Sequence, residues 1–175
     1  MSRTQDSPKE NVVSLRSAAA MHAAAIREIA KSSGIDAWTV DHYLQEIHST
    51  ESIVLVAVYD EAVLGFVLGR VIPGNVAATE AEIYNIAVVN EARRTGIGRM
   101  LFAAAIEHFV SKACECIWLE VRSSNSAAVQ FYENNGFNRS AIRRNFYADP
   151  VEDAFVMRLD LAGKGPTEPS RSACL

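Results

Sequence analysis

Two segments of this chain hold residues whose types and spacing could carry chemistry, and the first is Arg93-Arg94-Thr95-Gly96-Ile97-Gly98. It joins a predicted strand to a predicted helix. Glycines at i and i+2 let a ligand come close to the backbone, and successive amides at a helix N-terminus form a concave anion site. A pyrophosphate would fit there, although the spacing matches neither a Walker loop nor a dinucleotide fingerprint. A plain strand-to-helix turn with solvated arginines is the alternative that this segment alone leaves open.

The second segment is a strand predicted over 114–122 that runs into a helix predicted over 125–135. Glu120 is a carboxylate near the carboxyl end of an otherwise apolar strand, a position where a general base can be buried. Asn125 and Tyr132 are seven residues apart, so they share one face of the helix at a separation of roughly 10.5 Å along its axis. That face could hold a long ligand at two points, and Asn125 could also cap the helix.

Structural roles compete with these chemical ones. Glu120 could be a structural carboxylate paired with Arg122 or Arg143, and Tyr132 could be a core aromatic beside Phe131. The two cysteines in the strand over 114–122 have no second pair, and the four histidines show no ligand spacing. The sequence therefore predicts no metal site.

Three further residues could shape a pocket for a second substrate. Glu82 and Tyr84 precede the loop with the two glycines and could line such a pocket, although an alternating strand explains them equally well. Trp38 could shape the same groove or fill the core, and the core is the favoured reading.

The elements that must position these residues indicate a mixed α/β sheet. Helices are predicted where apolar residues recur at helical spacing, over 18–31, 36–47, 98–111 and 125–135. Strands are predicted where β-branched and apolar residues run together, over 52–59, 63–72, 81–89, 114–122, 137–146 and 153–161. Asp60-Glu61-Ala62 is expected to form a hairpin turn, and Pro73-Gly74-Asn75 a loop.

Length and composition bound the class of protein. With 175 residues, 49% hydrophobic and 22% charged, the chain suits one folded domain, which we place at 11–161 between flexible extensions at 1–10 and 162–175. A net charge of −4 gives no basic excess for binding nucleic acid. No apolar run reaches the roughly 20 residues that span a membrane, no signal peptide is evident, and three cysteines form no disulfide framework. A cytoplasmic protein is expected.

Taken together, the motifs resemble the GNAT N-acetyltransferase superfamily. The residues that carry the resemblance are Asn85-Ile86-Ala87-Val88, the arginine and glycine loop, Leu119-Glu120-Val121-Arg122, Asn125, Ala128, Phe131-Tyr132 and Gly136-Phe137. The longer stretches 118–128, 132–138 and 142–147 more narrowly resemble the bacterial RimI type, the ribosomal-protein-alanine N-acetyltransferases. The resemblance is dense over 80–160 and implies a single-domain GNAT fold with a mixed, mostly antiparallel sheet flanked by helices.

What the resemblance implies is transfer of an acetyl group from acetyl-CoA by direct attack in a ternary complex. The cofactor-binding residues would be Ile86, Ala87 and Val88 for the acetyl and pantetheine, Arg94, Thr95, Gly96, Ile97, Gly98 and Arg99 for the pyrophosphate, and Asn125 for the cofactor arm. Glu120 would take the proton from the incoming ammonium, directly or through water. Tyr132 would protonate the leaving thiolate. These roles suit an amine that is protonated at neutral pH and a phenol with a pKa near 10.

The acceptor implied by the resemblance is the N-terminal alanine of a small-subunit ribosomal protein, whose basic chain the acidic balance would tolerate. A small amine or a lysine side chain is the alternative acceptor, and a non-catalytic acyl-CoA-binding regulator is the alternative class. The chain departs from many relatives at Val89-Asn90, where they have Asp-Pro, and at Ala148-Asp149-Pro150 in the substrate-facing loop. The second departure puts the peptide preference in question.

Overall fold

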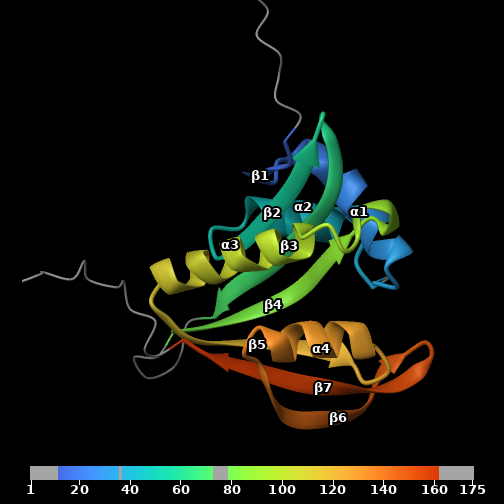
Figure 1. The fold of residues 1–175 in the computed structure, drawn as a ribbon, viewed down its shortest axis with the longest axis vertical. Helices are drawn as coiled ribbons and strands as arrows, with labels where there is room; N and C mark the ends of the chain where they lie inside the picture. The colour runs from blue at the N-terminus through green and yellow to red at the C-terminus, as the bar shows by residue number, and fades with distance from the viewer. Residues whose placement is uncertain (1–11, 36, 73–78, 162–175) are drawn as a thin grey trace, which may run out of the picture.

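The computed structural model describes residues 12–35, 37–72 and 79–161, and these form one seven-stranded sheet flanked by helices (Figure 1). The strands lie in the order β1-β2-β3-β4-β5-β7-β6, and only the β4–β5 pair is parallel. Their bounds are β1 Ser14–Ser17, β2 Ser52–Tyr59, β3 Ala62–Ile72, β4 Thr79–Val88, β5 Cys114–Arg122, β6 Asn138–Ala148 and β7 Val151–Asp160. This is the mixed, mostly antiparallel sheet that the sequence predicts.

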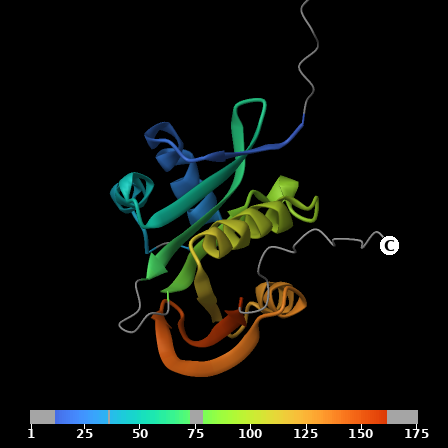
Figure 2. The ribbon, with the colours of Figure 1, turned by 90° about the vertical axis from the view of Figure 1, so that its left-hand side faces the viewer.

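Within the described ranges, four α-helices cover the sheet, two on each face (Figure 2). Their bounds are α1 Ala23–Ser32, α2 Val40–His48, α3 Ile97–Ser111 and α4 Ser126–Asn134. Short 3-10 turns precede α1 and follow β4, at Ala20–His22 and Asn90–Ala92. The helices α1 and α2 pack on β2, β3 and β4 from one side, while α3 and α4 bury an apolar stripe on the other side of the sheet.

The core accordingly divides into two apolar clusters separated by the sheet. The cluster under α3 and α4 contains Leu101, Phe109 and Leu119, all buried. The cluster under α1 and α2 contains Tyr43 and Phe66, whose rings meet edge to face at 5.7 Å. Alternate residues of each strand feed opposite clusters, as the two-residue period of a strand requires. Burial of these side chains is the main force that fixes where the strand ends lie.

The parallel pair β4–β5 separates before either strand ends. Its ladder runs only from Thr79 opposite Cys114 to Ile83 opposite Leu119, although β4 continues to Val88. The two strands diverge beyond that point (Figure 1). Since each keeps its other neighbour, the divergence leaves a gap whose two sides carry backbone groups that no sheet partner uses.

A bulge in β4 lies at the start of this gap. The β3–β4 register passes from Gly69 opposite Ile83 to Leu68 opposite Asn85, so Tyr84 is the extra residue. Gly69 allows the two strands to approach here, since a Cβ at that position would lie 2.6 Å from the carbonyl oxygen of Glu82. Because of this extra residue, the alternation of side chains along β4 shifts by one position. A different set of β4 side chains therefore faces α1 and α2 after Tyr84.

Most of the predicted elements are confirmed, with three differences. The strands over 52–59 and 114–122 and the hairpin between β2 and β3 lie where they are predicted. The strand β1 was not predicted, the segment predicted as helical over 18–31 begins with a 3-10 turn, and α2 begins at Val40 rather than at residue 36. Thr39 sets that start, since its hydroxyl accepts a hydrogen bond from the His42 amide at 3.3 Å.

The predicted loop at 73–75 and the predicted extensions at 1–10 and 162–175 lie outside the described residues. Within the described residues, none of the helices has the length and apolar character needed to cross a membrane.

Candidate active site

The loop with the two glycines forms a tight turn that ends in the N-terminus of α3. Arg94 and Gly96 have φ values of 66° and 95°, both in the left-handed region. Gly96 caps the helix, and its carbonyl oxygen accepts the first helical bond from the Met100 amide at 3.0 Å. The hydroxyl of Thr95 donates to the carbonyl of Ala92 at 2.7 Å and fixes the turn. The three amides after Gly96 belong to the first helical turn, which has no intrahelical acceptors for them.

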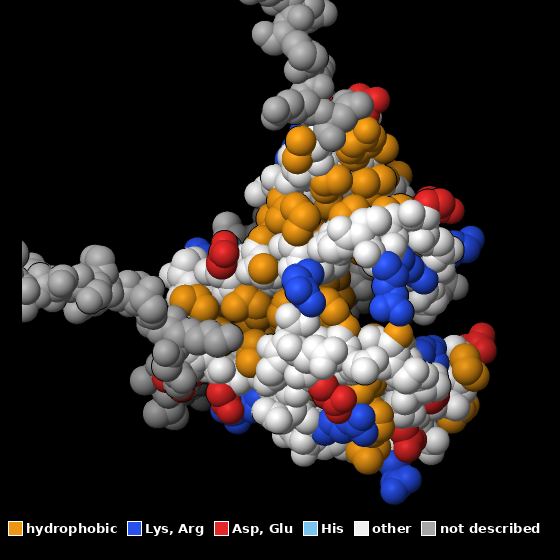
Figure 3. All heavy atoms as spheres, in the orientation of Figure 1, with side chains coloured by type: hydrophobic (Ala, Val, Ile, Leu, Met, Phe, Trp, Pro, Cys, Tyr) orange, Lys and Arg blue, Asp and Glu red, His pale blue; other side chains and the backbone are white. Residues whose placement is uncertain are grey.

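The arginines at this loop have different roles. Arg93 folds back, since its Nε donates to the Val88 carbonyl at 3.0 Å and its guanidinium reaches the Ser33 hydroxyl at 3.1 Å. These two contacts direct the Arg93 side chain toward Val88 and Ser33. Arg94 and Arg99 are exposed and can serve at the anion site. Figure 3 shows a notch between the part of the surface formed by α3 and the part formed by α4, with basic side chains at its rim.

The backbone of β4 supplies the other side of the notch. The Val89 amide donates to the Leu64 carbonyl of β3 at 2.8 Å, so the alternation of an antiparallel ladder turns the amide and carbonyl of Val88 away from β3 and into the gap. The same alternation directs the backbone amide and carbonyl of Ile86 into the gap and those of Ala87 toward β3. Of the three consecutive residues predicted to offer backbone groups, two are therefore placed to do so.

Glu120 lies on β5 just past the point where β4 and β5 separate. Its side chain keeps 21% of its surface exposed, and it forms an ion pair with Arg143 of β6. The Arg143 guanidinium also lies 4.1 Å from the centroid of the Phe146 ring. One of the two predicted ion pairs for Glu120 is thus confirmed, while Arg122 pairs with Glu152 instead. Glu120 remains partly exposed at the edge of the gap.

A second carboxylate lies near Glu120, on the face of the sheet opposite to α3 and α4. Glu82 lies one position before the end of the β4–β5 ladder, opposite Trp118, and so on the same face of the sheet as Glu120. Burial raises the pKa of Glu82, and the negative charge of Glu120 raises it further, while a hydrogen bond from Tyr84 and the charge of Arg143 oppose the shift. Sequence reasoning gave Glu82 only a lining role; its coupling to Glu120 is visible only in the fold.

Tyr132 lies on α4 and is 7% exposed. It contacts three phenylalanines, Phe102, Phe131 and Phe137, at ring separations between 5.5 and 6.4 Å. Burial raises the pKa of Tyr132 well above its ordinary value, and nearby Tyr147 adds to the shift. The phenol therefore holds its proton at any physiological pH. The core role foreseen for Tyr132 is confirmed, and that role is compatible with proton donation.

Asn125 is the N-cap of α4. Its side-chain oxygen accepts a hydrogen bond from the Ala128 amide at 3.1 Å, and the residue itself is exposed. The predicted cap is confirmed. The side chain lies at the start of the helix that carries Tyr132.

Tyr147 is a site residue that sequence reasoning missed. Burial raises its pKa, as does the charge of Glu120, while Arg122, whose guanidinium lies 4.1 Å above its ring, lowers it. The Tyr147 ring lies 5.1 Å from that of Phe146, over which the Arg143 guanidinium that pairs with Glu120 is placed. The aromatic pair at 146–147 was the available signal. The register shift between Arg143 and Tyr147 hides the direction of the side chain from any alternation argument.

No group of three or more His, Cys, Asp or Glu side chains that could hold a metal ion occurs in the described part of the chain.

The fold and the site combine a glycine-containing turn at the start of α3, a parallel strand pair that separates and two neighbouring carboxylates. A family model described as "Acetyltransferase (GNAT) family" matches residues 23–137. The chain belongs to this family, as its motifs predicted.

Two curated relatives and one solved structure show which members of the family this chain resembles. A Salmonella typhimurium protein named ribosomal protein bS18-alanine N-acetyltransferase is 44% identical over 89 residues, which are 50% of this chain and 60% of that protein. A Haemophilus influenzae protein of the same name is 41% identical over 81 residues, 45% of this chain and 55% of the relative. The matches thus span less than two thirds of these relatives. The crystal structure of the ribosomal-protein-S18-alanine N-acetyltransferase from Escherichia coli superposes with a TM-score of 0.77 at 28% identity, over 90% of this chain and 99% of the other.

Proposed function

We propose that this protein transfers the acetyl group of acetyl-CoA to the N-terminal α-amino group of a protein, by direct attack in a ternary complex. The observation that carries the proposal is the separation of β4 from β5, which opens a gap between the N-terminus of α3 on one face of the sheet and the carboxylates of Glu82 and Glu120 on the other. The similarity to proteins named as N-terminal alanine acetyltransferases supports the same activity.

The residues present fit acetyl-CoA as the donor. The amides of Ile97, Gly98 and Arg99 would bind the pyrophosphate, together with the turn at Arg94, Thr95 and Gly96. The backbone groups that Ile86 and Val88 direct into the gap would bind the pantetheine and acetyl ends, and the Val88 amide would stabilise the oxyanion on the thioester carbonyl. Asn125 would contact the cofactor arm.

Gly98 offers a test of the pyrophosphate site. A Cβ at Gly98 would meet only Val88 Cγ2, at 3.8 Å, which is an ordinary contact. We expect Gly98→Ala to leave the unfolding temperature near that of the wild type and to weaken acetyl-CoA binding at least about tenfold, because the added methyl would occupy space the ligand needs. Isothermal titration calorimetry with acetyl-CoA measures the loss. Unchanged affinity would place the pyrophosphate elsewhere.

The chemistry needs two proton movements. An α-ammonium must lose a proton before its nitrogen can attack, and Glu120 would accept that proton, directly or through water. The nitrogen then bonds to the thioester carbonyl carbon, and the resulting tetrahedral species collapses as the carbon–sulfur bond breaks. Tyr132 would give its proton to the leaving CoA thiolate, so the products are an acetylated amine and free CoA.

Glu82 is the alternative base in this scheme. Its raised pKa brings it closer to the value at which a base works best near neutral pH, whereas Glu120 is engaged by Arg143. Two carboxylates at one side of the gap also favour a cationic acceptor, because the ammonium group balances their repulsion.

The acceptor we propose is the N-terminal alanine of a small-subunit ribosomal protein, acetylated in the cytoplasm. The names of the curated relatives support this substrate, and the carboxylates at the gap suit a basic peptide. A small amine or a lysine side chain is the competing acceptor. A regulator that only binds acyl-CoA is the competing class.

A panel of acceptors tests these three possibilities. CoA release is followed with a ribosomal-type peptide that has a free N-terminal alanine, with the same peptide blocked at its N-terminus, and with several small amines. We expect turnover with the free peptide alone. Turnover confined to small amines would overturn the acceptor, and binding of acetyl-CoA without turnover on any acceptor would favour the regulator.

A further inference from the structure

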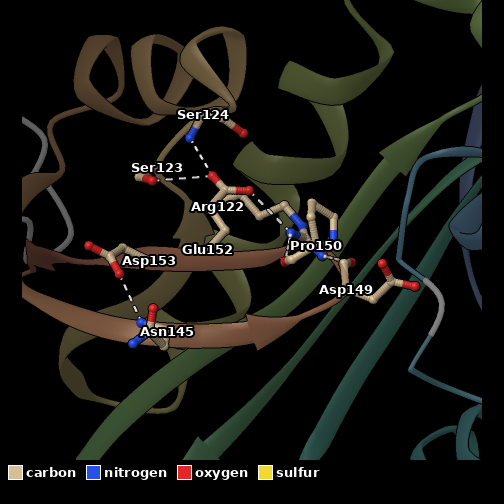
Figure 4. Close-up of polar contacts among 8 residues, drawn as sticks. All are labelled: Arg122, Ser123, Ser124, Asn145, Asp149, Pro150, Glu152 and Asp153. Carbon is tan, nitrogen blue, oxygen red and sulfur yellow. Dashed lines mark hydrogen bonds and ion pairs between the residues drawn. The ribbon is translucent and has the colours of Figure 1, made fainter.

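Glu152, near the start of β7, joins two segments that border the notch (Figure 4). Its Oε1 accepts hydrogen bonds from the Ser124 amide at 2.6 Å and the Ser123 hydroxyl at 3.2 Å, and its Oε2 accepts from Arg122 at 3.1 Å. These bonds lower the pKa of Glu152 to about 2, the Ser124 amide contributing most. The carboxylate is therefore ionised and fully engaged at neutral pH.

Arg122 extends this contact to the turn between β6 and β7. Its Nη2 donates to the Asp149 carbonyl at 2.8 Å and its Nη1 to the Pro150 carbonyl at 3.3 Å (Figure 4). The same guanidinium covers the ring of Tyr147. Arginine suits this position because its planar fork can bind several acceptors while its face lies on an aromatic ring.

The two segments that Glu152 joins, here called arms, lead to different substrates of the proposed reaction. One arm is the segment at Ser123 and Ser124, and the other is the turn at 149–150. Ser124 precedes Asn125, which caps the helix that carries Tyr132, so this arm leads to the cofactor side. The turn at 149–150 follows Tyr147, which contacts Phe146 at 5.1 Å, and the Arg143 guanidinium over the Phe146 ring pairs with Glu120, so the other arm leads to the acceptor side. Glu152 contacts the first arm directly and the second through Arg122.

We propose that Glu152 is a positioning residue that holds the acceptor side of the notch through Arg122 and Tyr147, and the cofactor side through Ser124 and the start of α4. The proposal rests on the proposed function for its substrates. Glu152 touches no reacting atom in this scheme; it fixes the relative placement of the groups that do, on which the rate of an oriented reaction depends.

Acid unfolding gives an independent check of the bonds to Glu152. Because the folded-state pKa is depressed from 4.5 to about 2, the stabilisation is present above the unfolded value and is lost as the pH falls toward 2. We expect wild type to unfold at a higher temperature than Glu152→Gln at neutral pH, and the difference to shrink between about pH 4.5 and pH 2. A constant difference would contradict the depressed pKa.

Steady-state kinetics of four proteins tests the positioning role: wild type, Glu152→Gln, Arg122→Met and the double variant. We expect Glu152→Gln to raise the KM for peptide and for acetyl-CoA, each about tenfold, the size of a charge-assisted hydrogen bond. Arg122→Met is expected to raise only the peptide KM. The double variant should keep the peptide KM of Arg122→Met, because Glu152 acts on the acceptor side through Arg122.

The matched control is Glu133→Gln, which removes an exposed ion pair between α4 and β6 with Arg139 at 2.9 Å and touches neither arm. It should leave both KM values unchanged. The proposal would be overturned if Glu152→Gln had the same KM values as wild type. It would also be overturned if Glu133→Gln raised the two KM values as much as Glu152→Gln does. If Glu152→Gln does not fold, Arg122→Met alone tests the proposal. A raised KM for peptide with an unchanged KM for acetyl-CoA would support it, and any other result would overturn it.

Hydrogen exchange separates this proposal from the proposed function. If wild type acetylates no peptide, the acceptor assignment fails, and the positioning role is then judged from exchange in segments 123–125 and 145–151. We expect faster exchange in both segments for Glu152→Gln and only in 145–151 for Arg122→Met, with α3 unchanged. Unaltered exchange in these segments would overturn the positioning role.

Discussion

Replacing Glu120 by glutamine should lower kcat by about 10²- to 10⁴-fold, the usual contribution of a general base, while leaving the affinity for acetyl-CoA within about twofold of wild type. Glutamine keeps the size of the side chain and can still contact Arg143, but it cannot accept the proton of an ammonium. Turnover with the free N-terminal peptide and calorimetric titration of acetyl-CoA measure the two quantities. The loss should shrink at high pH, where the amine is already deprotonated.

Glu82→Gln is the matched variant, because it removes the neighbouring carboxylate on the same face of the sheet. Burial and the charge of Glu120 both penalise its ionised form, so Glu82→Gln should raise the unfolding temperature at neutral pH and cost less kcat than Glu120→Gln. A larger loss of kcat in Glu82→Gln would assign the base to Glu82. Equal losses of turnover and of acetyl-CoA affinity in Glu120→Gln would remove the base role from Glu120.

Replacing Tyr132 by phenylalanine should lower kcat by about 10²-fold with little change in unfolding temperature. The ring would keep its contacts with Phe102, Phe131 and Phe137, so only the hydroxyl is lost. The raised pKa of Tyr132 keeps that hydroxyl protonated, so the pH profile of the wild type should show no loss of activity from its ionisation below pH 10. Turnover and thermal unfolding of the purified variant check both expectations.

Tyr59→Phe is the control for this change, since Tyr59 ends β2, is 37% exposed and makes no part of the notch. It should match wild type in kcat. A thioester with a better leaving group than CoA should also recover part of the rate lost in Tyr132→Phe, because a stable thiolate needs less protonation. No recovery would indicate that the Tyr132 hydroxyl does not protonate the leaving thiolate.

The fold was largely predictable because its strands and helices are locally consistent. The alternation in β2 and β5 and the stripe of α3 each specify one face to bury, and burial then fixes the element. The four residues of β1 carry no such pattern, and their conformation comes from pairing with β2. The late start of α2 depends on the cap at Thr39, which a count of apolar positions does not detect.

The candidate site was predictable where it is encoded in a contiguous segment. The loop at 93–98 and the helix cap at Asn125 depend on neighbours along the chain, and the structure places both as expected. Contacts between strands were not predictable in the same way. The coupling of Glu82 to Glu120 depends on the register of the β4–β5 pair, and the direction of Tyr147 depends on a register shift in β6.

The central claim is transfer of acetyl to a free N-terminal α-amine, and one peptide can test it. The peptide has a ribosomal-type sequence with a free N-terminal alanine and one internal lysine, and it is incubated with the protein and acetyl-CoA. Tandem mass spectrometry then locates the added acetyl group. The proposed mechanism predicts one acetyl group, on the α-nitrogen of the alanine; an acetyl group on the lysine, or none on either nitrogen while added small amines are acetylated, would contradict it.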